Sequence, residues 1–461
     1  MVIQAFWFVA LFAIPLWLMF QRRGDWLLLW VVAVTCTDVC SVRGPITVSG
    51  ASVVGVLLIP YSARLLVVSK MRGPLLWALA HLAYLTVLGI AFGFAFPWPD
   101  DLGRSFNLQA PGRTVLSLTR EAASLSIAVF VAQQVAKARR PDRFLNVVLL
   151  TTLLTSTVAV LERVTGVSFY VLFTSGVLEP TYHNLRVRGL NFEPRGLALS
   201  EAHAVVICVL LLSVRKRVRF VLATLVANLA GLFLSGSTSG LITTAAGLGT
   251  MSLARQRVRR YMLWTLLAIG LAAAVAAQSS FASTWQNLLM ERLGTTVRHG
   301  GAETWFENIV YRMEVFDTVA ALFLVANPVY LFVGTGPALI SLPATAYLPL
   351  TVYSQDLAMA GINSPPTMGW LLELANGGFV GFFFWVAFVI SGRRSLDFVI
   401  RHSSAERQSW IVGKWAFLGA SAIYVVAAGF LTSCWALFMG LALGAELLRQ
   451  RWVILNVRGH V

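Results

Sequence analysis

The sequence predicts an all-α fold, that of a polytopic helical membrane protein, from its composition, its hydropathy and its pattern of apolar runs. Of 461 residues, 57% are hydrophobic and only 12% are charged, and the mean hydropathy is +0.75. A soluble domain usually carries about twice that charged fraction. Apolar runs near the spanning length of about 20 residues recur along the whole chain, and a backbone in hydrocarbon satisfies its hydrogen bonds best as a helix. A secreted disulfide scaffold, a disordered chain and an ordinary cytosolic enzyme are excluded.

About thirteen transmembrane helices are expected, within a range of 12–14. The apolar runs lie at 3–20, 26–41, 51–69, 74–96, 114–135, 145–162, 197–213, 219–234, 238–253, 261–277, 368–391, 410–428 and 432–448. Run 3–20 lacks the basic start and the small-residue cleavage site of a signal peptide, so it is interpreted as the first span.

The positive charge predicts the orientation. The net charge of +16 would point to nucleic acid in a soluble protein. Here the basic residues gather in alternate short loops between apolar runs, which is the pattern of cytoplasmic loops. No nucleic-acid partner is therefore expected, and the N-terminus is predicted to be periplasmic and the C-terminus cytoplasmic. The basic loops are 22–23, 70–72, 137–143, 215–219, 255–260, 393–414 and the tail from 449.

Two long outer segments divide the chain into five parts. N-terminal transmembrane helices (1–162) precede a periplasmic loop with an arginine cluster (163–196), and central transmembrane helices (197–277) precede a large periplasmic loop (278–367). C-terminal transmembrane helices and a cytoplasmic tail follow (368–461). Within the large loop, 314–332 is apolar enough for a surface-lying or re-entrant helix. If it spans, the count becomes fourteen and the C-terminal topology reverses.

Four arginines in these outer segments are the main candidate binding residues: Arg186, Arg188, Arg195 and Arg312. A guanidinium group is always charged and offers a planar fork of donors that suits phosphate oxygens. Such a cluster facing the outer leaflet would bind a diphosphate. The alternative is interfacial snorkelling, or ion pairs with neighbouring glutamates.

Other candidates are weaker. Glu193 would act as a base toward a sugar hydroxyl or hold the arginines in position. His203 lies in an apolar run, where a hydrogen-bonded core histidine is the better interpretation. Cys36 and Cys40 share a helix face at i, i+4 spacing, but nothing nearby completes a tetrahedral metal site. No metal-binding or nucleotide-binding motif occurs, so metal-free chemistry without a cofactor is expected.

Four stretches carry a resemblance to a known family. Residues 186–198 are similar to the pattern Arg-x-x-Gly…Asn/Glu-Pro-x-x-x-Ala, and 234–240 to a Thr/Ser-Gly-Ser-Arg-Gly turn that here lacks its arginine. Arg312 with 327–336 is similar to Arg…Pro…Gly-x-Gly, and 363–381 to a fourth motif that ends in Gly-x-x-Gly. By the order and spacing of these four stretches, the chain resembles the O-antigen polymerase and O-antigen ligase (Wzy-type) superfamily of bacterial inner membranes.

The resemblance implies a GT-C-like membrane glycosyltransferase that works on the periplasmic face of the inner membrane. Its donor would be an oligosaccharide on undecaprenyl diphosphate, and a chain-length regulator protein would be a further partner besides the lipid bilayer. An acceptor hydroxyl would attack the anomeric carbon with inversion and without metal. The resemblance also implies roles for two arginines: Arg188 (or Arg186) and Arg312 would hold the diphosphate of the donor and stabilise the negative charge that develops on it.

One departure from the family bears on the acceptor. Ligases of this superfamily carry a histidine in the fourth motif. The residue at that position in this chain is Thr367. Threonine is not a general base near neutral pH. The sequence therefore favours a polymerase of lipopolysaccharide or exopolysaccharide repeat units, with Glu193 or Asp356 as the candidate base.

Three alternatives stay open. The first is an O-antigen ligase that transfers the glycan to lipid A-core. The second, from another class, is a secondary transporter of an anionic or lipid-linked substrate; against it, no repeated half is visible, and the charges are expected in outer loops instead of mid-span. The third is a structural membrane scaffold, which leaves the outer arginines unexplained.

Overall fold

The structure, a computed structural model, describes residues 2–40, 49–68, 72–96, 109–175, 187–191, 193–254, 256–278, 315–344, 366–427 and 432–458. No strand occurs among these residues. The helices of the first half are α1 (Val2–Phe20), α2 (Gly24–Cys36), α3 (Gly50–Leu57), α4 (Ile59–Val68), α5 (Pro74–Leu88), η1 (Gly89–Ala95), α6 (Ala110–Ala138), α7 (Asp142–Thr165), α8 (Phe169–Ser175), α9 (Pro194–Ser213) and α10 (Val218–Leu234). Those of the second half are α11 (Thr238–Gly249), η3 (Thr250–Leu253), α12 (Gln256–Gln278), α15 (Val315–Ala326), α16 (Pro328–Val333), α17 (Ser341–Ala344), α19 (Gly369–His402), α20 (Arg407–Val426) and α21 (Thr432–Arg458).

The helical character predicted from hydropathy is confirmed, and the number of spans is not. Six helical segments of the described chain are long and apolar enough to cross a membrane: 74–95, 110–138, 142–165, 194–213, 369–402 and 407–426. They indicate a multi-pass membrane protein. The other predicted runs also fall on helices, but these do not meet the same criteria of length and hydropathy, so the count of thirteen stays a prediction.

The outer surface of the bundle is apolar, as a lipid-facing surface should be. Large hydrophobic side chains are exposed on α1, α10 and α12, among them Phe6, Trp17, Val226, Leu267 and Leu271. Soluble monomers rarely expose apolar patches of this extent. Polar contacts instead occur inside the bundle, where helices pack on helices.

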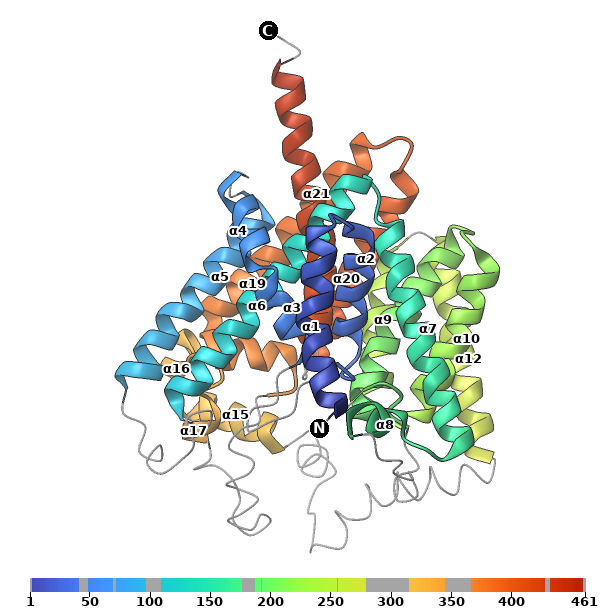
Figure 1. Cartoon of the computed structure of the whole chain (residues 1–461), viewed down its shortest axis with the longest axis horizontal. Coiled ribbons are helices and arrows are strands. Elements are labelled where there is room, and N and C mark those ends of the chain that lie inside the picture. Colours follow the sequence, from blue (N-terminus) through green and yellow to red (C-terminus); the bar gives the residue numbers. More distant parts are fainter. Residues whose placement is uncertain are drawn as a thin grey trace, which may run out of the picture.

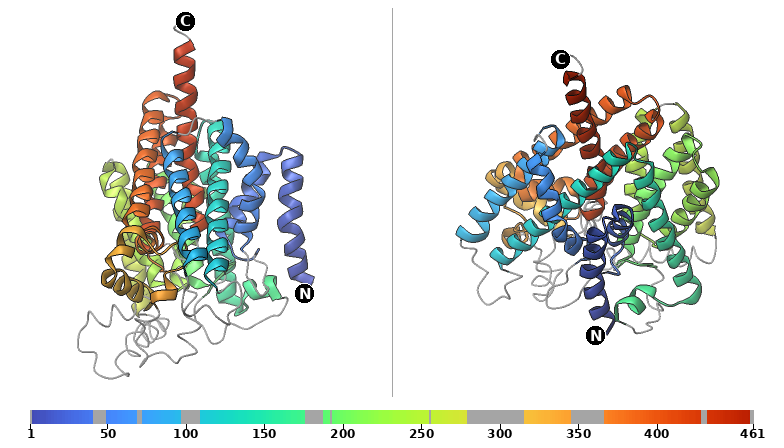
Figure 2. Two further views of the ribbon diagram at one scale, coloured as in Figure 1. Left: turned by 90° about the vertical axis from the view of Figure 1, so that its left-hand side faces the viewer. Right: turned by 45° about the horizontal axis from the view of Figure 1, so that its top comes forward.

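Two groups of helices pack against each other to form the bundle (Figure 1). The long helix α9 is buried along nearly its whole length among α7, α10, α11 and α20. The second group is built on α6, which packs against α3 and α21, while α19 packs against α5, α20 and α21. In both further views α21 continues out of the bundle at the end opposite to α1's N-terminus (Figure 2).

The basic turns meet at one end of the bundle. Lys216, in the turn between α9 and α10, donates to Asp142 at the start of α7 (2.7 Å) and to Ser409 at the start of α20 (2.6 Å). Trp410 donates to the Arg139 carbonyl of the α6–α7 turn (2.9 Å). Figure 1 shows the α1–α2 and α19–α20 turns at this same upper end, whereas α8, α15 and α17 lie at the lower end. We call these the basic end and the loop end.

Helix α19 is broken near its start by Gly378. This residue has φ 60° and ψ −162°, so two helical segments join at a kink. A Cβ atom at this position would clash with the Phe332 carbonyl of α16. Glycine is needed here for both reasons, because it accepts positive φ and allows close backbone approach.

The apolar segment predicted at 314–332 forms two short helices. α15 has 12 residues and ends at Ala326, and α16 has 6 residues and begins at Pro328. The break follows from proline, which favours the first turn of a new helix. At 1.5 Å per residue α15 is about 18 Å long, shorter than the hydrocarbon core of about 30 Å. It packs on α17 and α19 at the loop end.

Candidate functional site at the loop end

The four stretches singled out in the sequence are joined by hydrogen bonds at the loop end. Val187 in the first stretch donates its amide to the Leu234 carbonyl in the second (3.2 Å). Arg195 in the first donates to the Thr367 carbonyl in the fourth (3.4 Å). Amides of Thr335 and Gly336, in the third, donate to carbonyls of α19 in the fourth (2.8 and 3.1 Å). Segments that are 172 residues apart in sequence therefore form one assembly.

Arg188 is held in this assembly by its backbone. The amides of Arg188 and Gly189 both donate to the Oε2 atom of Glu162, at 3.2 and 2.7 Å. The side chain is half-buried. Within the described chain its guanidinium group makes no salt bridge or side-chain hydrogen bond, although it interacts electrostatically with the Glu162 carboxylate. A half-buried guanidinium group whose donors are not used in this way is suited to bind an anion.

The position of Arg188 relative to the basic end is given by α7. Asp142 contacts Lys216 at the basic end, and Glu162 holds the Arg188 amide. Twenty residues of helix separate these two contacts, a rise of about 30 Å. That distance matches the thickness of a bilayer's hydrocarbon core. Arg188 and the basic turns therefore lie a membrane thickness apart.

Arg195 and Glu193 lie at the start of α9. Pro194 occupies the first helical position, where its missing N–H has no cost. Glu193 is exposed, its side chain does not cap the helix, and no ion pair joins it to Arg188 or Arg195 among the described residues. The structure therefore gives Glu193 no role in holding these two arginines.

Asp317 connects the large outer segment to α19, and the sequence analysis had not singled it out. Asp317 is 5% exposed. It accepts hydrogen bonds from the Thr367 amide (2.7 Å), the Met368 amide (3.2 Å) and the Thr367 hydroxyl (2.5 Å). Thr367, the residue at the ligase histidine position, thus has a structural partner. The hydrogen bond from Arg195 to the Thr367 carbonyl places Thr367 beside the candidate anion site.

The remaining predicted site residues lie outside the described part of the chain. These are Arg186, Arg312 and Asp356. Of the proposed arginine cluster, Arg188 and Arg195 are both present at the loop end, and whether the other two join them stays a prediction.

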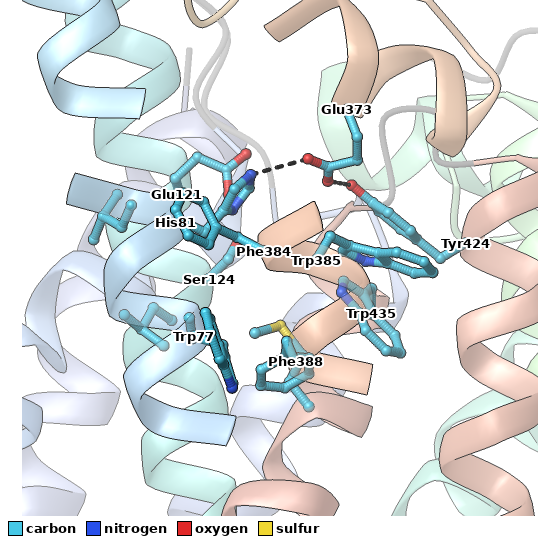
Figure 3. A pocket seen from close by; sticks show the side chains of 14 residues that line it. Trp77, His81, Glu121, Ser124, Glu373, Phe384, Trp385, Phe388, Tyr424 and Trp435 are labelled. Atoms are coloured by element: carbon cyan, nitrogen blue, oxygen red, sulfur yellow. Dashed lines mark hydrogen bonds and ion pairs between the residues drawn. The ribbon is translucent and has the colours of Figure 1, made fainter. Parts of the chain in front are cut away.

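A cavity of about 60 Å³ lies between α5, α6, α19, α20 and α21, inside the bundle. Its polar wall is formed by His81, Glu121, Glu373 and Tyr424 (Figure 3). The His81 Nε2 atom lies 3.0 Å from Oε2 of Glu373, and the Tyr424 hydroxyl donates to Oε1 of the same carboxylate at 2.5 Å. Charged residues therefore occur between spanning helices as well as in the outer segments, because two carboxylates face this cavity.

The rest of the cavity wall is apolar apart from Ser124, and half of it is aromatic. Trp77, Phe384, Trp385, Phe388 and Trp435 line it. Trp385 stacks on Tyr424 at a centroid distance of 5.8 Å, which fixes both rings. Its indole Nε1 atom is buried and has no hydrogen-bond acceptor within the described chain.

One histidine weighed in the sequence lies in the core, and one carboxylate of an apolar run lines the cavity. His203 is buried, its Nδ1 lies 2.7 Å from the Leu199 carbonyl and its ring stacks on Phe438, so the interpretation as a core histidine is confirmed. Glu121 lines the cavity. The signal that could have found this cavity was present in the sequence, since Glu121, His81 and Glu373 are ionisable residues inside apolar runs.

Comparison with known proteins adds no assignment. No protein-family model matches the chain, and no curated protein matches it.

Proposed function

We propose that the protein is a polymerase of bacterial cell-surface polysaccharide, which joins undecaprenyl-diphosphate-linked repeat units at the loop end of the bundle, on the periplasmic side of the inner membrane. The observation that carries the proposal is the assembly of the four stretches. Each carries a pattern that is recognisable in the sequence, and the hydrogen bonds Val187–Leu234, Arg195–Thr367 and Thr335–Ala375 connect them. Their meeting in one place supports a shared role.

The charge of the site supports a diphosphate as its ligand. Arg188 makes no salt bridge in the described chain, and Arg195 lies at the N-terminus of α9, where the helix dipole also favours an anion. In the proposed reaction a sugar hydroxyl attacks the anomeric carbon of the donor, and the bond from that carbon to the diphosphate oxygen breaks. The arginines would stabilise the negative charge that the leaving diphosphate gains.

The position of the site supports a periplasmic reaction. The basic turns lie at the opposite end of the bundle, and basic turns favour the cytoplasmic side. A lipid-linked donor would reach the loop end from the outer leaflet, with its polyprenyl tail along the apolar surface.

Thr367 favours polymerase over ligase. Its hydroxyl donates to Asp317, so this position has a binding role in the fold and offers no imidazole to activate an acceptor. The two functions differ in acceptor, which is a second repeat unit for a polymerase and a core lipid for a ligase.

The test is chain elongation by the purified full-length protein in nanodiscs, with undecaprenyl-diphosphate repeat units as the only substrate. Products longer than one repeat are expected. In a parallel reaction with lipid A-core as acceptor, a polymerase gives no core-linked glycan. Core-linked product without elongation would identify a ligase, and elongation that is unchanged in Arg188→Ala would show that the proposed anion site is wrong.

A transporter is the second candidate, because the bundle contains a polar cavity with two carboxylates. Ionisable residues in spanning helices often mark substrate or ion pathways. A transporter would move a lipid-linked glycan across proteoliposomes and would leave its glycosidic bonds unchanged. Uptake or flipping without elongation would favour this function.

A further inference from the structure

The cavity between α5, α6, α19 and α20 has the chemistry of a ligand site. Its polar wall presents acceptors, since Glu121 and Glu373 both line it. Glu373 is partnered by His81 and Tyr424. Glu121 makes no ion pair or hydrogen bond within the described chain, so it can accept a donor from a ligand. Glu373 has one partner at each carboxylate oxygen, and because a carboxylate offers about four lone-pair sites, it can accept a ligand donor as well.

The same cavity also presents a donor. The buried Nε1–H of Trp385 has no acceptor in the described chain. Buried donors in folded proteins nearly always find a partner, and an exception calls for an explanation. A bound group with a lone pair would supply one. An unpaired donor and an unpaired acceptor thus belong to one cavity wall (Figure 3).

These features select the class of ligand. An anion would be repelled by the two carboxylates, an alkylammonium ion would leave the indole N–H without an acceptor, and an apolar molecule would satisfy neither group. A hydroxyl group donates and accepts, and the aromatic walls suit the apolar face of a sugar ring. The volume of about 60 Å³ leaves room for about four to six water molecules, which is the scale of one pyranose ring.

The cavity is close to the proposed reaction centre. Glu373 belongs to the fourth stretch and lies six residues after Thr367, whose carbonyl binds Arg195. Six residues correspond to about 9 Å along a helix. A ligand hydroxyl at Glu373 would therefore be near an anion held by Arg195.

We propose that this cavity binds one sugar ring of the acceptor, and that Glu373 is the catalytic base that takes the proton from its attacking hydroxyl. The hydroxyl oxygen forms the new bond to the donor's anomeric carbon, the proton goes to the Glu373 carboxylate, and the electron pair of the broken bond leaves with the diphosphate. His81 and Tyr424 are positioning residues, because they fix the carboxylate from two sides. The base assignment rests on the proposed function, whereas sugar binding does not.

Binding is tested on the purified full-length protein by saturation-transfer NMR with methyl pyranosides of glucose, galactose, mannose and N-acetylglucosamine. At least one is expected to bind saturably, and Trp385→Phe, which keeps a ring and removes the N–H, should weaken it about 10-fold. Trp30→Phe is the matched control, because Trp30 also has a buried Nε1 without an acceptor in the described chain but lies outside the cavity. No saturable pyranoside binding, or equal binding by Trp385→Phe, would overturn the site.

The base is tested in the elongation reaction with Glu373→Gln. Its kcat should fall by about 10²–10⁴-fold, while KM for the acceptor changes only a few-fold and the protein elutes and melts like the wild type. Should Glu373→Gln not fold, Glu373→Asp replaces it, with partial activity expected from a displaced carboxylate. Normal elongation by a folded Glu373 variant would refute the base and leave the polymerase proposal standing. If the wild type itself does not elongate, the polymerase proposal fails, and NMR still decides on the sugar site.

Discussion

Asp317 shows how one buried carboxylate can organise the loop end. It accepts two amides and one hydroxyl where α19 begins, and it is 5% exposed. Hydrogen bonds of this kind to a charged group each contribute about 1.5–3 kcal/mol, and they leave buried donors unsatisfied when lost.

Asp317→Ala is therefore expected to lower the free energy of unfolding by about 3 kcal/mol, measured from the denaturation midpoint in mixed micelles. Asp25→Ala is the matched control. Asp25 is 56% exposed and pairs with Arg143 at the basic end, so a loss of less than about 1 kcal/mol is expected. Equal losses in both variants would mean that Asp317 has no organising role.

For single residues, the sequence predicts the environment where the neighbouring residues determine it, and it does not predict contacts between residues far apart in the chain. His203 lies in the core, as its apolar neighbours in sequence indicate, whereas the anion-binding role of Arg188 and Arg195 stays a prediction. The pairing of His81 with Glu373 was not predictable, because the two residues are almost 300 positions apart and hydropathy does not say which helices touch. Asp317 was hidden for the same reason, since its partner Thr367 lies 50 residues away.

Among the elements, α19 links the two sites. Its N-cap residue Met368 donates its amide to Asp317, its second turn carries Glu373, and the kink at Gly378 allows α16 to pack closely against it. The apolar run predicted a helix from 368, close to the observed start at Gly369. The kink was not predicted, because glycine also occurs in unbroken membrane helices.

Gly378→Ala is expected to cost about 2 kcal/mol or more, because alanine at φ 60° is strained and its Cβ would clash with the Phe332 carbonyl. Gly381→Ala is the control, since a Cβ at that position would meet its nearest neighbour at 3.8 Å. The thermal midpoint of each purified variant is the measurement. A Gly378→Ala protein as stable as Gly381→Ala would show that the kink is dispensable.

The whole molecule has two chemically different ends, about 30 Å apart along α7. Sequence charge predicted this polarity, and the contacts of Lys216 and Trp410 gather basic turns at one end. Which end faces the cytoplasm depends on the membrane and is proposed from the charge bias alone.

Cysteine labelling tests this orientation. The four native cysteines are buried and free, so they should give little background. Thr165→Cys, at the exposed end of α7, should react with a membrane-impermeant maleimide in intact spheroplasts, and Ala405→Cys, in the α19–α20 turn, only after lysis. The reverse pattern would place the loop end in the cytoplasm and exclude a periplasmic reaction.

The central claim is that Arg188 at the loop end binds a lipid diphosphate, and the most direct measurement is the Kd of undecaprenyl diphosphate for the purified protein in nanodiscs. Arg188→Ala should raise Kd by about 10- to 100-fold, the loss expected for charge-assisted hydrogen bonds of about 1.5–3 kcal/mol. Arg394→Ala, which removes an exposed arginine of α19 near the basic end, should leave Kd unchanged. Equal affinity in the wild type and both variants would contradict the account.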